Sequence, residues 1–133
     1  MTVEALHQVA LHVADLDRAV AFYRDVVGLR LVARFDPPGL AFFDLGGVRL
    51  LLESGAPASL LYLLVDDVAA TRSRLTGAGV TFVDEPHLIF FDAEGLFGPP
   101  GVGEWMTFFH DPEGNLVALV ERRPGEQEGG RAS

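Results

Sequence analysis

The fold is decided by the stretch HVADLDRAVAFYRDVVGL (residues 12–29), in which an extended pattern changes into a helical one. Asp15 is predicted to cap the helix, because a carboxylate at this position accepts the unpaired backbone N–H groups and suits the positive helix end. After it, apolar side chains recur on one helical face, at Leu16, Ala19, Val20, Tyr23 and Val27. Gly28 is predicted to end the helix.

The second half of the chain repeats this pattern. In LLVDDVAATRSRLTGAGV (63–80), Asp67 takes the place of Asp15, and Gly77 and Gly79 supply the helix stop. Three strand-like runs follow each helix: LRLVARF (29–35), LAFFDL (40–45) and VRLLLES (48–54) in the first half, and VTFV (80–83), EWMTFFH (104–110) and NLVALVE (115–121) in the second.

Each half is therefore predicted to be a βαβββ module, in which a helix covers one face of a four-stranded sheet and leaves the other open. The predicted class is α+β, with two modules (about 5–55 and 58–123) that form curved, partly open mixed sheets, each with a helix on its outer face. They make one domain over residues 1–123, and 124–133 is predicted to be a flexible tail. The long connection at 84–103 is interpreted either as a functional lid or as an insertion packed over an open edge.

Composition excludes several functions. The chain of 133 residues has no cysteine, so disulfides and thiolate sites are excluded. Its net charge of −9 argues against a nucleic-acid partner and is compatible with a cationic ligand. Because no signal peptide pattern and no apolar run of membrane-spanning length is visible, no membrane partner is expected and a cytoplasmic location follows by default.

Three segments together resemble the vicinal oxygen chelate family, which includes glyoxalases, bleomycin-resistance proteins and extradiol dioxygenases. They are HVADLDRAVAFYRDVVGL (12–29), GGVRLLLE (46–53) and FFHDPEGNLVALVE (108–121), and the resemblance extends over residues 5–123. It implies a paired βαβββ fold and a divalent metal held by one residue from each of four strands. Metal-dependent members are isomerases, epimerases, lyases or dioxygenases, whereas others bind a drug without metal.

The resemblance assigns the four metal-ligand positions to Gln8, Leu50, Leu60 and Ala118. Leucine and alanine offer no lone pair to a cation, and one neutral amide does not hold a catalytic divalent ion. The usual metal is therefore expected to be missing. A rebuilt site from Gln8, His12, His87 and Glu104 is the alternative, although the spacing of these residues is not diagnostic.

Strand alternation predicts which side chains line the open face of the sheets. The expected set is Gln8, Ala10, His12, Leu50, Leu52, Leu60, Tyr62, Leu64, Leu116, Ala118 and Val120. A mainly apolar hollow with a few polar groups is typical of a small-molecule pocket, and the alternative is that these side chains fill one another as core.

Three aromatic or titratable side chains are further candidates. His12 is a candidate acid–base group, or else a satisfied core histidine. His87 begins the long connection and is placed to close over the hollow. Trp105 is interpreted first as a core or interface aromatic and second as a platform on which a flat ligand stacks.

The leading hypothesis is a glyoxalase-like or bleomycin-resistance-like protein that binds a small, largely hydrophobic molecule without the usual metal. The first alternative is a metal-dependent lyase, isomerase or dioxygenase of the same superfamily with an unconventional ligand set. The second is an interaction module whose hollow is filled. The resemblance also implies a homodimer.

Overall fold

The structure is a computed structural model that describes residues 5–125. The chain divides into two compact units. The first runs to Leu60 and includes Asp111–Leu116, and the second contains Leu61–His110 and the residues from Val117 onward. Most of the predicted tail, from residue 126 on, lies outside the described residues.

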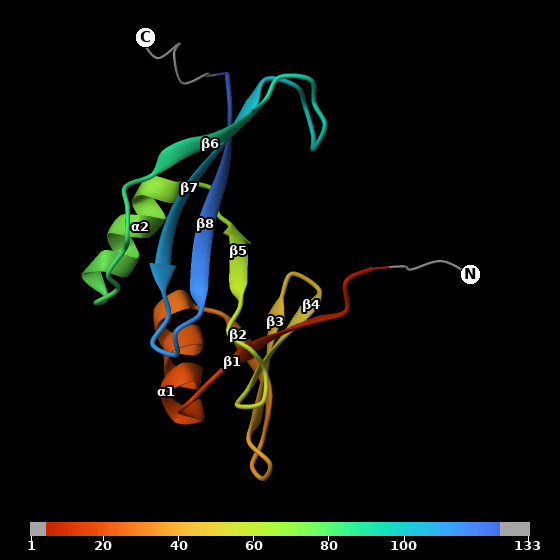
Figure 1. The fold of residues 1–133 in the computed structure, drawn as a ribbon, viewed down its shortest axis with the longest axis vertical. Coiled ribbons are helices and arrows are strands. Elements are labelled where there is room, and N and C mark those ends of the chain that lie inside the picture. Colours follow the sequence, from red (N-terminus) through yellow and green to blue (C-terminus); the bar gives the residue numbers. More distant parts are fainter. Residues whose placement is uncertain (1–4, 126–133) are drawn as a thin grey trace. The chain divides into compact units, whose positions relative to one another are not determined.

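The first unit is a four-stranded mixed sheet with one helical segment (Figure 1). Its strands lie in the order β1-β4-β3-β2, with β1 parallel to β4 and the other pairs antiparallel. The elements are β1 Gln8–His12, α1 Leu16–Ala21, the π-helical η1 Phe22–Val27, β2 Arg30–Phe35, β3 Leu40–Leu45 and β4 Val48–Glu53.

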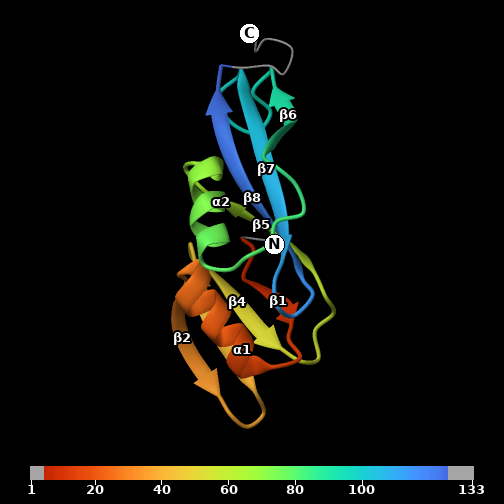
Figure 2. The ribbon, with the colours of Figure 1, turned by 90° about the vertical axis from the view of Figure 1, so that its left-hand side faces the viewer.

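The helix begins and ends as predicted. The carboxylate of Asp15 accepts the N–H of Arg18 at 3.1 Å, and Gly28 follows the last turn with φ at +92°. The regular α-helix ends at Ala21, and the next turn is π-helical, a widening that the sequence did not predict. Its buried face packs on β3 and β4 (Figure 2).

The second unit has the same element types and the sheet order β5-β8-β7-β6. Asp67 caps its helix, accepting the N–H of Ala70 at 2.9 Å, and the helix packs on β7. The elements are β5 Leu60–Leu64, α2 Val68–Gly77, β6 His87–Asp92, β7 Val102–His110 and β8 Leu116–Pro124. The predicted α+β class with two βαβββ-like modules is confirmed.

The predicted strand at 80–83 is wrong. Only Phe82 forms an isolated bridge, opposite Phe109, and the strand next to β7 is β6, inside the long connection. Asp84 explains the interruption, because its carboxylate accepts the backbone N–H of Phe108 and the hydroxyl of Thr107, both at 2.9 Å. The side chain of Asp84 thus accepts the N–H of Phe108, which the backbone of a neighbouring strand would otherwise have bonded.

The placement of Leu50 and Leu52 on the open face is also wrong. Leu50 pairs in register with Val9 and Leu52 with Leu11, so both leucines share the face of Leu11. Leu11, Leu50 and Leu52 are fully buried. A shift of one residue in register moves every side chain of a strand to the opposite face.

No helix among residues 5–125 is long and apolar enough to cross a membrane.

Candidate functional site

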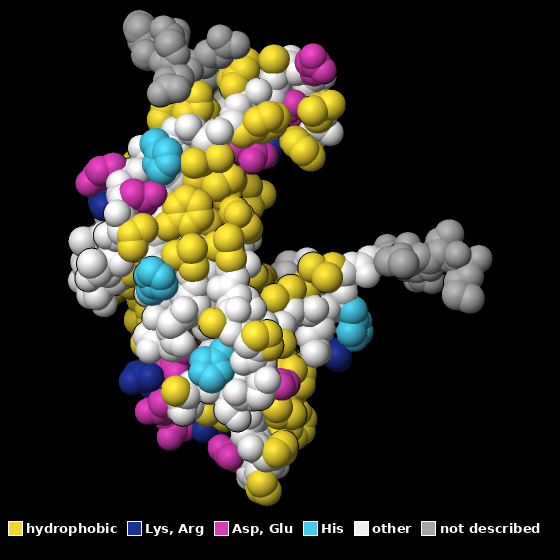
Figure 3. Space-filling view, in the orientation of Figure 1, with side chains coloured by type: hydrophobic (Ala, Val, Ile, Leu, Met, Phe, Trp, Pro, Cys, Tyr) yellow, Lys and Arg dark blue, Asp and Glu magenta, His cyan; other side chains and the backbone are white. Residues whose placement is uncertain are grey.

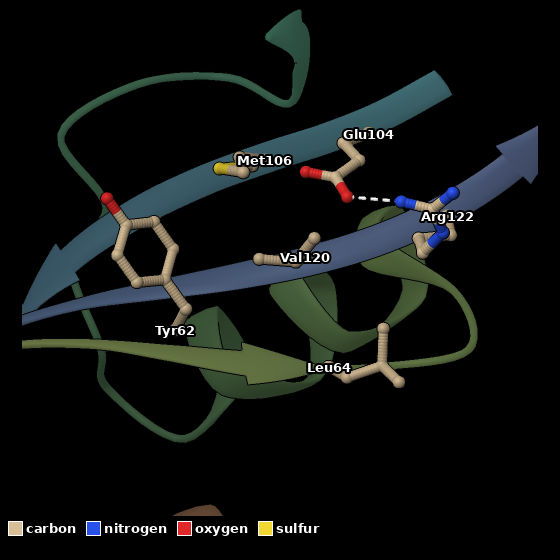
Figure 4. Close-up of a pocket in the computed structure, with 6 residues that line it drawn as sticks. All are labelled: Tyr62, Leu64, Glu104, Met106, Val120 and Arg122. Carbon is tan, nitrogen blue, oxygen red and sulfur yellow. Dashed lines mark hydrogen bonds and ion pairs between the residues drawn. The ribbon is translucent and has the colours of Figure 1, made fainter. Parts of the chain in front are cut away.

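The second unit carries a hollow of about 460 Å³ on the sheet face built by β5, β7 and β8 (Figure 4). Figure 3 shows hydrophobic side chains gathered over the strands of this unit. The hollow is lined by Tyr62, Leu64, Glu104, Met106, Val120 and Arg122. Its volume is within the range of small-molecule sites.

Strand alternation explains why these side chains share one face. On β5, Leu61 and Leu63 are buried, whereas Tyr62 is 55% and Leu64 is 75% exposed. The predicted alternation of this strand is confirmed. Next to the hollow, a small apolar cluster of Met106, Ala118 and Val120, with Phe108 packed against it, forms part of the same sheet.

One end of the hollow is charged. Arg122 donates through Nη1 to Oε2 of Glu104 and through Nη2 to Oδ2 of Asp92, the latter at 3.2 Å. Asp92 also accepts the backbone N–H groups of Leu96 at 2.7 Å and Phe97 at 2.9 Å. The N–H of Phe97 contributes most to lowering the pKa of Asp92 below its usual range, followed by Leu96 and Arg122.

These contacts order the loop between β6 and β7. The buried carboxylate of Asp92 accepts the N–H groups of two loop residues, Leu96 and Phe97. The ring of Phe97 also lies edge-on to that of Phe90, with 5.9 Å between the centroids. A Cβ at Gly98 would lie 3.5 Å from Nη2 of Arg122, so the loop passes directly beside this guanidinium. Hydrophobic side chains gather at the tip of this hairpin (Figure 3).

The polar candidates of the first unit are bonded within it. Nδ1 of His12 lies 3.2 Å from the carbonyl oxygen of Ser54 and 3.1 Å from that of Ala56, so Nδ1 carries the proton and donates. Oε1 of Gln8 accepts the Nε–H of Arg49 at 3.0 Å. Both side chains therefore have partners within the first unit.

The remaining candidates lie around β6 and β7. His87 begins β6, is exposed, and its Nδ1 lies 2.9 Å from the carbonyl oxygen of Glu85. Trp105 lies between Glu104 and Met106 on β7 and so points to the opposite face from the hollow. The guanidinium of Arg123 lies 4.5 Å above its ring, which supports its interpretation as a packed aromatic.

The comparisons with known proteins agree with this architecture. Residues 5–119 match the Glyoxalase/Bleomycin resistance protein/Dioxygenase superfamily. A glyoxylase-like domain-containing protein of Didymella fabae is 30% identical over 129 residues, 84% of this chain and 88% of that protein. The chain belongs to this superfamily. Metallothiol transferase FosB of Lysinibacillus sphaericus is 35% identical over 76 residues, 56% of this chain and 52% of FosB.

Solved structures of the superfamily share the fold. Lactoylglutathione lyase from Agrobacterium tumefaciens is 27% identical with a TM-score of 0.70, covering 91% of this chain and 96% of its own. The antibiotic binding protein TnmS3 from Streptomyces sp. CB03234 is 26% identical with a TM-score of 0.70, covering 92% and 98%. The solved structures similar to this chain thus include a protein named as an enzyme and one named as a binding protein, at nearly the same identity and TM-score.

The metal that many superfamily members use does not fit the residues of this chain. Leu60 and Ala118 stand at two of the positions assigned to ligands and offer no lone pair. The assignment of Leu50 to a third position is wrong, because this side chain is buried on the helix side of its sheet. Gln8, the fourth, bonds to Arg49. Within residues 5–125 no group of three His, Cys, Asp or Glu side chains is arranged to hold a metal ion. Of the assigned positions, Gln8, Leu60 and Ala118 therefore supply one neutral oxygen between them, which is too few for a divalent cation.

Proposed function

We propose that this superfamily member is a binding protein that holds a small, largely apolar molecule in the hollow over β5, β7 and β8 without a metal. The observation that carries the proposal is that Leu60 and Ala118 offer no donor atom and that no three His, Cys, Asp or Glu side chains within residues 5–125 are arranged to hold a metal ion. Without a metal, the metal-dependent lyase, isomerase and dioxygenase reactions have no means of polarising their substrates.

The lining of the hollow supports binding. The ring of Tyr62, the thioether of Met106 and the side chain of Val120 offer an apolar surface, and a thioether adapts to ligands of different shape. Glu104 and Arg122 at one end offer the few polar groups that orient a ligand. The similarity of the fold to TnmS3, which is named an antibiotic binding protein, supports the proposal.

Binding of the neutral, fluorescent N-phenylnaphthylamine, titrated in buffer that contains EDTA, tests the proposal. Wild-type protein is expected to bind it saturably. Tyr62→Ala is expected to weaken binding roughly tenfold, because an aromatic contact with a ligand contributes about 1.4 kcal/mol. Since Tyr62 is half exposed, the variant is expected to fold normally.

Phe35→Ala is the matched control, because Phe35 is also an aromatic residue on a strand, is 51% exposed, and does not line the hollow. This variant is expected to bind like the wild type. Equal losses in the two variants, or no saturable binding by the wild type, would overturn the proposal.

A further inference from the structure

We propose that the molecule bound in the hollow carries a positively charged nitrogen beside its apolar body, and that the carboxylate of Glu104 receives it. This inference rests on the proposed function and specifies the class of ligand: an apolar amine in its ammonium form. The inference is argued from the hydrogen bonds of three charged side chains at this end of the hollow, Glu104, Arg122 and Asp92.

The formal charges at this end sum to −1, because Arg122 is flanked by Glu104 and Asp92. The two carboxylates differ in whether an oxygen atom remains without a hydrogen-bond donor. Both oxygens of Asp92 are used, Oδ1 by the N–H of Leu96 and Oδ2 by the N–H of Phe97 and by Arg122. Its side chain is also fully buried, so Asp92 serves the loop and is not available to a ligand.

Glu104 keeps one oxygen for a ligand. Its Oε2 accepts from Arg122, whereas no donor in the described part of the chain lies within hydrogen-bond distance of Oε1. Figure 4 shows Oε1 directed along β7 toward Met106, over the apolar part of the hollow. A ligand lying against Met106 and Val120 therefore meets an acceptor that bears charge and has no protein partner.

An anionic ligand is disfavoured at the same place. Both Nη atoms of Arg122 already donate to carboxylates, so an incoming anion would have to displace one of them or lie beside both. Either choice costs energy, because like charges repel and a displaced carboxylate loses its partner. The guanidinium therefore positions Glu104 and neutralises part of the local charge, and it is not itself the anion receptor.

Two other features favour a cation. The ring of Tyr62 lines the same hollow, and the face of an aromatic ring attracts an ammonium group. The net charge of −9 on the whole chain raises the local concentration of cations and the rate at which they associate. A charge-assisted hydrogen bond to Glu104 is expected to raise affinity about ten- to a hundredfold over a neutral ligand of the same shape.

Competition against bound N-phenylnaphthylamine tests the inference with three probes on one skeleton: naphthylmethylamine, naphthylmethanol and naphthoic acid. Wild-type protein is expected to bind the ammonium at least about tenfold more tightly than the alcohol, and the carboxylate most weakly. Glu104→Gln is expected to abolish the preference for the ammonium while keeping the affinity for the alcohol.

Two further variants separate recognition from damage to the fold. Glu85→Gln removes an exposed carboxylate of the same unit that does not line the hollow, and the preference for the ammonium is expected to stay as in the wild type. Arg122→Gln frees Oε2 of Glu104 and removes the nearby positive charge. This change is expected to increase the preference, which is the opposite of what simple disruption of the hollow would do.

The outcomes distinguish this inference from the proposed function. Binding of the alcohol with no preference for the ammonium, or with a preference for the carboxylate, would overturn the inference and leave the proposed function standing. Binding of neither the alcohol nor N-phenylnaphthylamine would overturn both.

Discussion

Replacing Asp111 by alanine is expected to lower the free energy of unfolding by roughly 3–5 kcal/mol, because it removes the acceptor of a buried network in the first unit. Its carboxylate accepts the hydroxyl of Tyr23 at 2.6 Å, the N–H of Glu113 at 2.9 Å and both the N–H and the side-chain amide of Asn115 at 2.8 and 2.9 Å. Burial, and then the charge of Asp111, raises the pKa of Tyr23, so the phenol remains a donor.

The network closes the turn between β7 and β8 onto β1. Asn115 also donates to the carbonyl oxygen of His12 at 2.8 Å and accepts the N–H of Ser59 at 3.0 Å. Urea unfolding of Asp111→Ala measures the loss, with Asp25→Ala as the control, because Asp25 forms an exposed ion pair with Arg24 and its removal is expected to cost below about 1 kcal/mol. Equal stability of the two variants would show that the network contributes nothing.

Leu50→Ala is expected to lower the free energy of unfolding by about 2–5 kcal/mol and to leave the affinity for N-phenylnaphthylamine unchanged. Leu50 is fully buried and pairs in register with Phe43, itself fully buried, on the face of the sheet toward the helix. The substitution opens a cavity in that core, away from any open sheet face. Denaturant unfolding and dye titration at a temperature where the variant is folded measure the two quantities.

Leu64→Ala is the matching variant with the opposite expectation. Leu64 is exposed and lines the hollow, so its truncation is expected to weaken dye binding while changing stability by less than about 0.5 kcal/mol. A loss of affinity in Leu50→Ala as large as that in Leu64→Ala would contradict the assignment of the binding site to the hollow that Leu64 lines.

The strand and helix pattern was predictable because local signals agreed with one another. Asp15 and Asp67 lie between extended and helical periodicities, and a carboxylate before an amphipathic turn has one favourable use, as an N-cap. The turn at Asp111 was likewise visible from its proline and glycine. The position of β6 was not predictable from the sequence. The pairing of residues 80–83 is interrupted because the side chain of Asp84 bonds to Thr107 and Phe108 of β7, and such a tertiary contact leaves no local signal.

The candidate site was predicted in part. Alternation along β5 correctly placed Tyr62 and Leu64 on the open face. The same reasoning placed Leu50 on the wrong face of its sheet, because packing fixes the register between strands that are distant in sequence. Sequence reasoning missed Met106 and Arg122. Met106 lies two residues after Glu104, and Arg122 lies two residues after Val120, both of which were named. The pairing of Arg122 with Glu104 needed the structure. The homodimer and the cytoplasmic location stay predictions.

The measurement that tests the central claim most directly is the metal content of the purified, untagged protein after incubation with nickel, zinc, iron, manganese and cobalt, followed by dialysis. No stoichiometric metal is expected, because Leu60 and Ala118 supply no donor atom and Gln8 supplies one neutral oxygen. One tightly held ion per chain, lost in His12→Ala or His87→Ala, would contradict it and make this superfamily member a metalloprotein with a rebuilt ligand set.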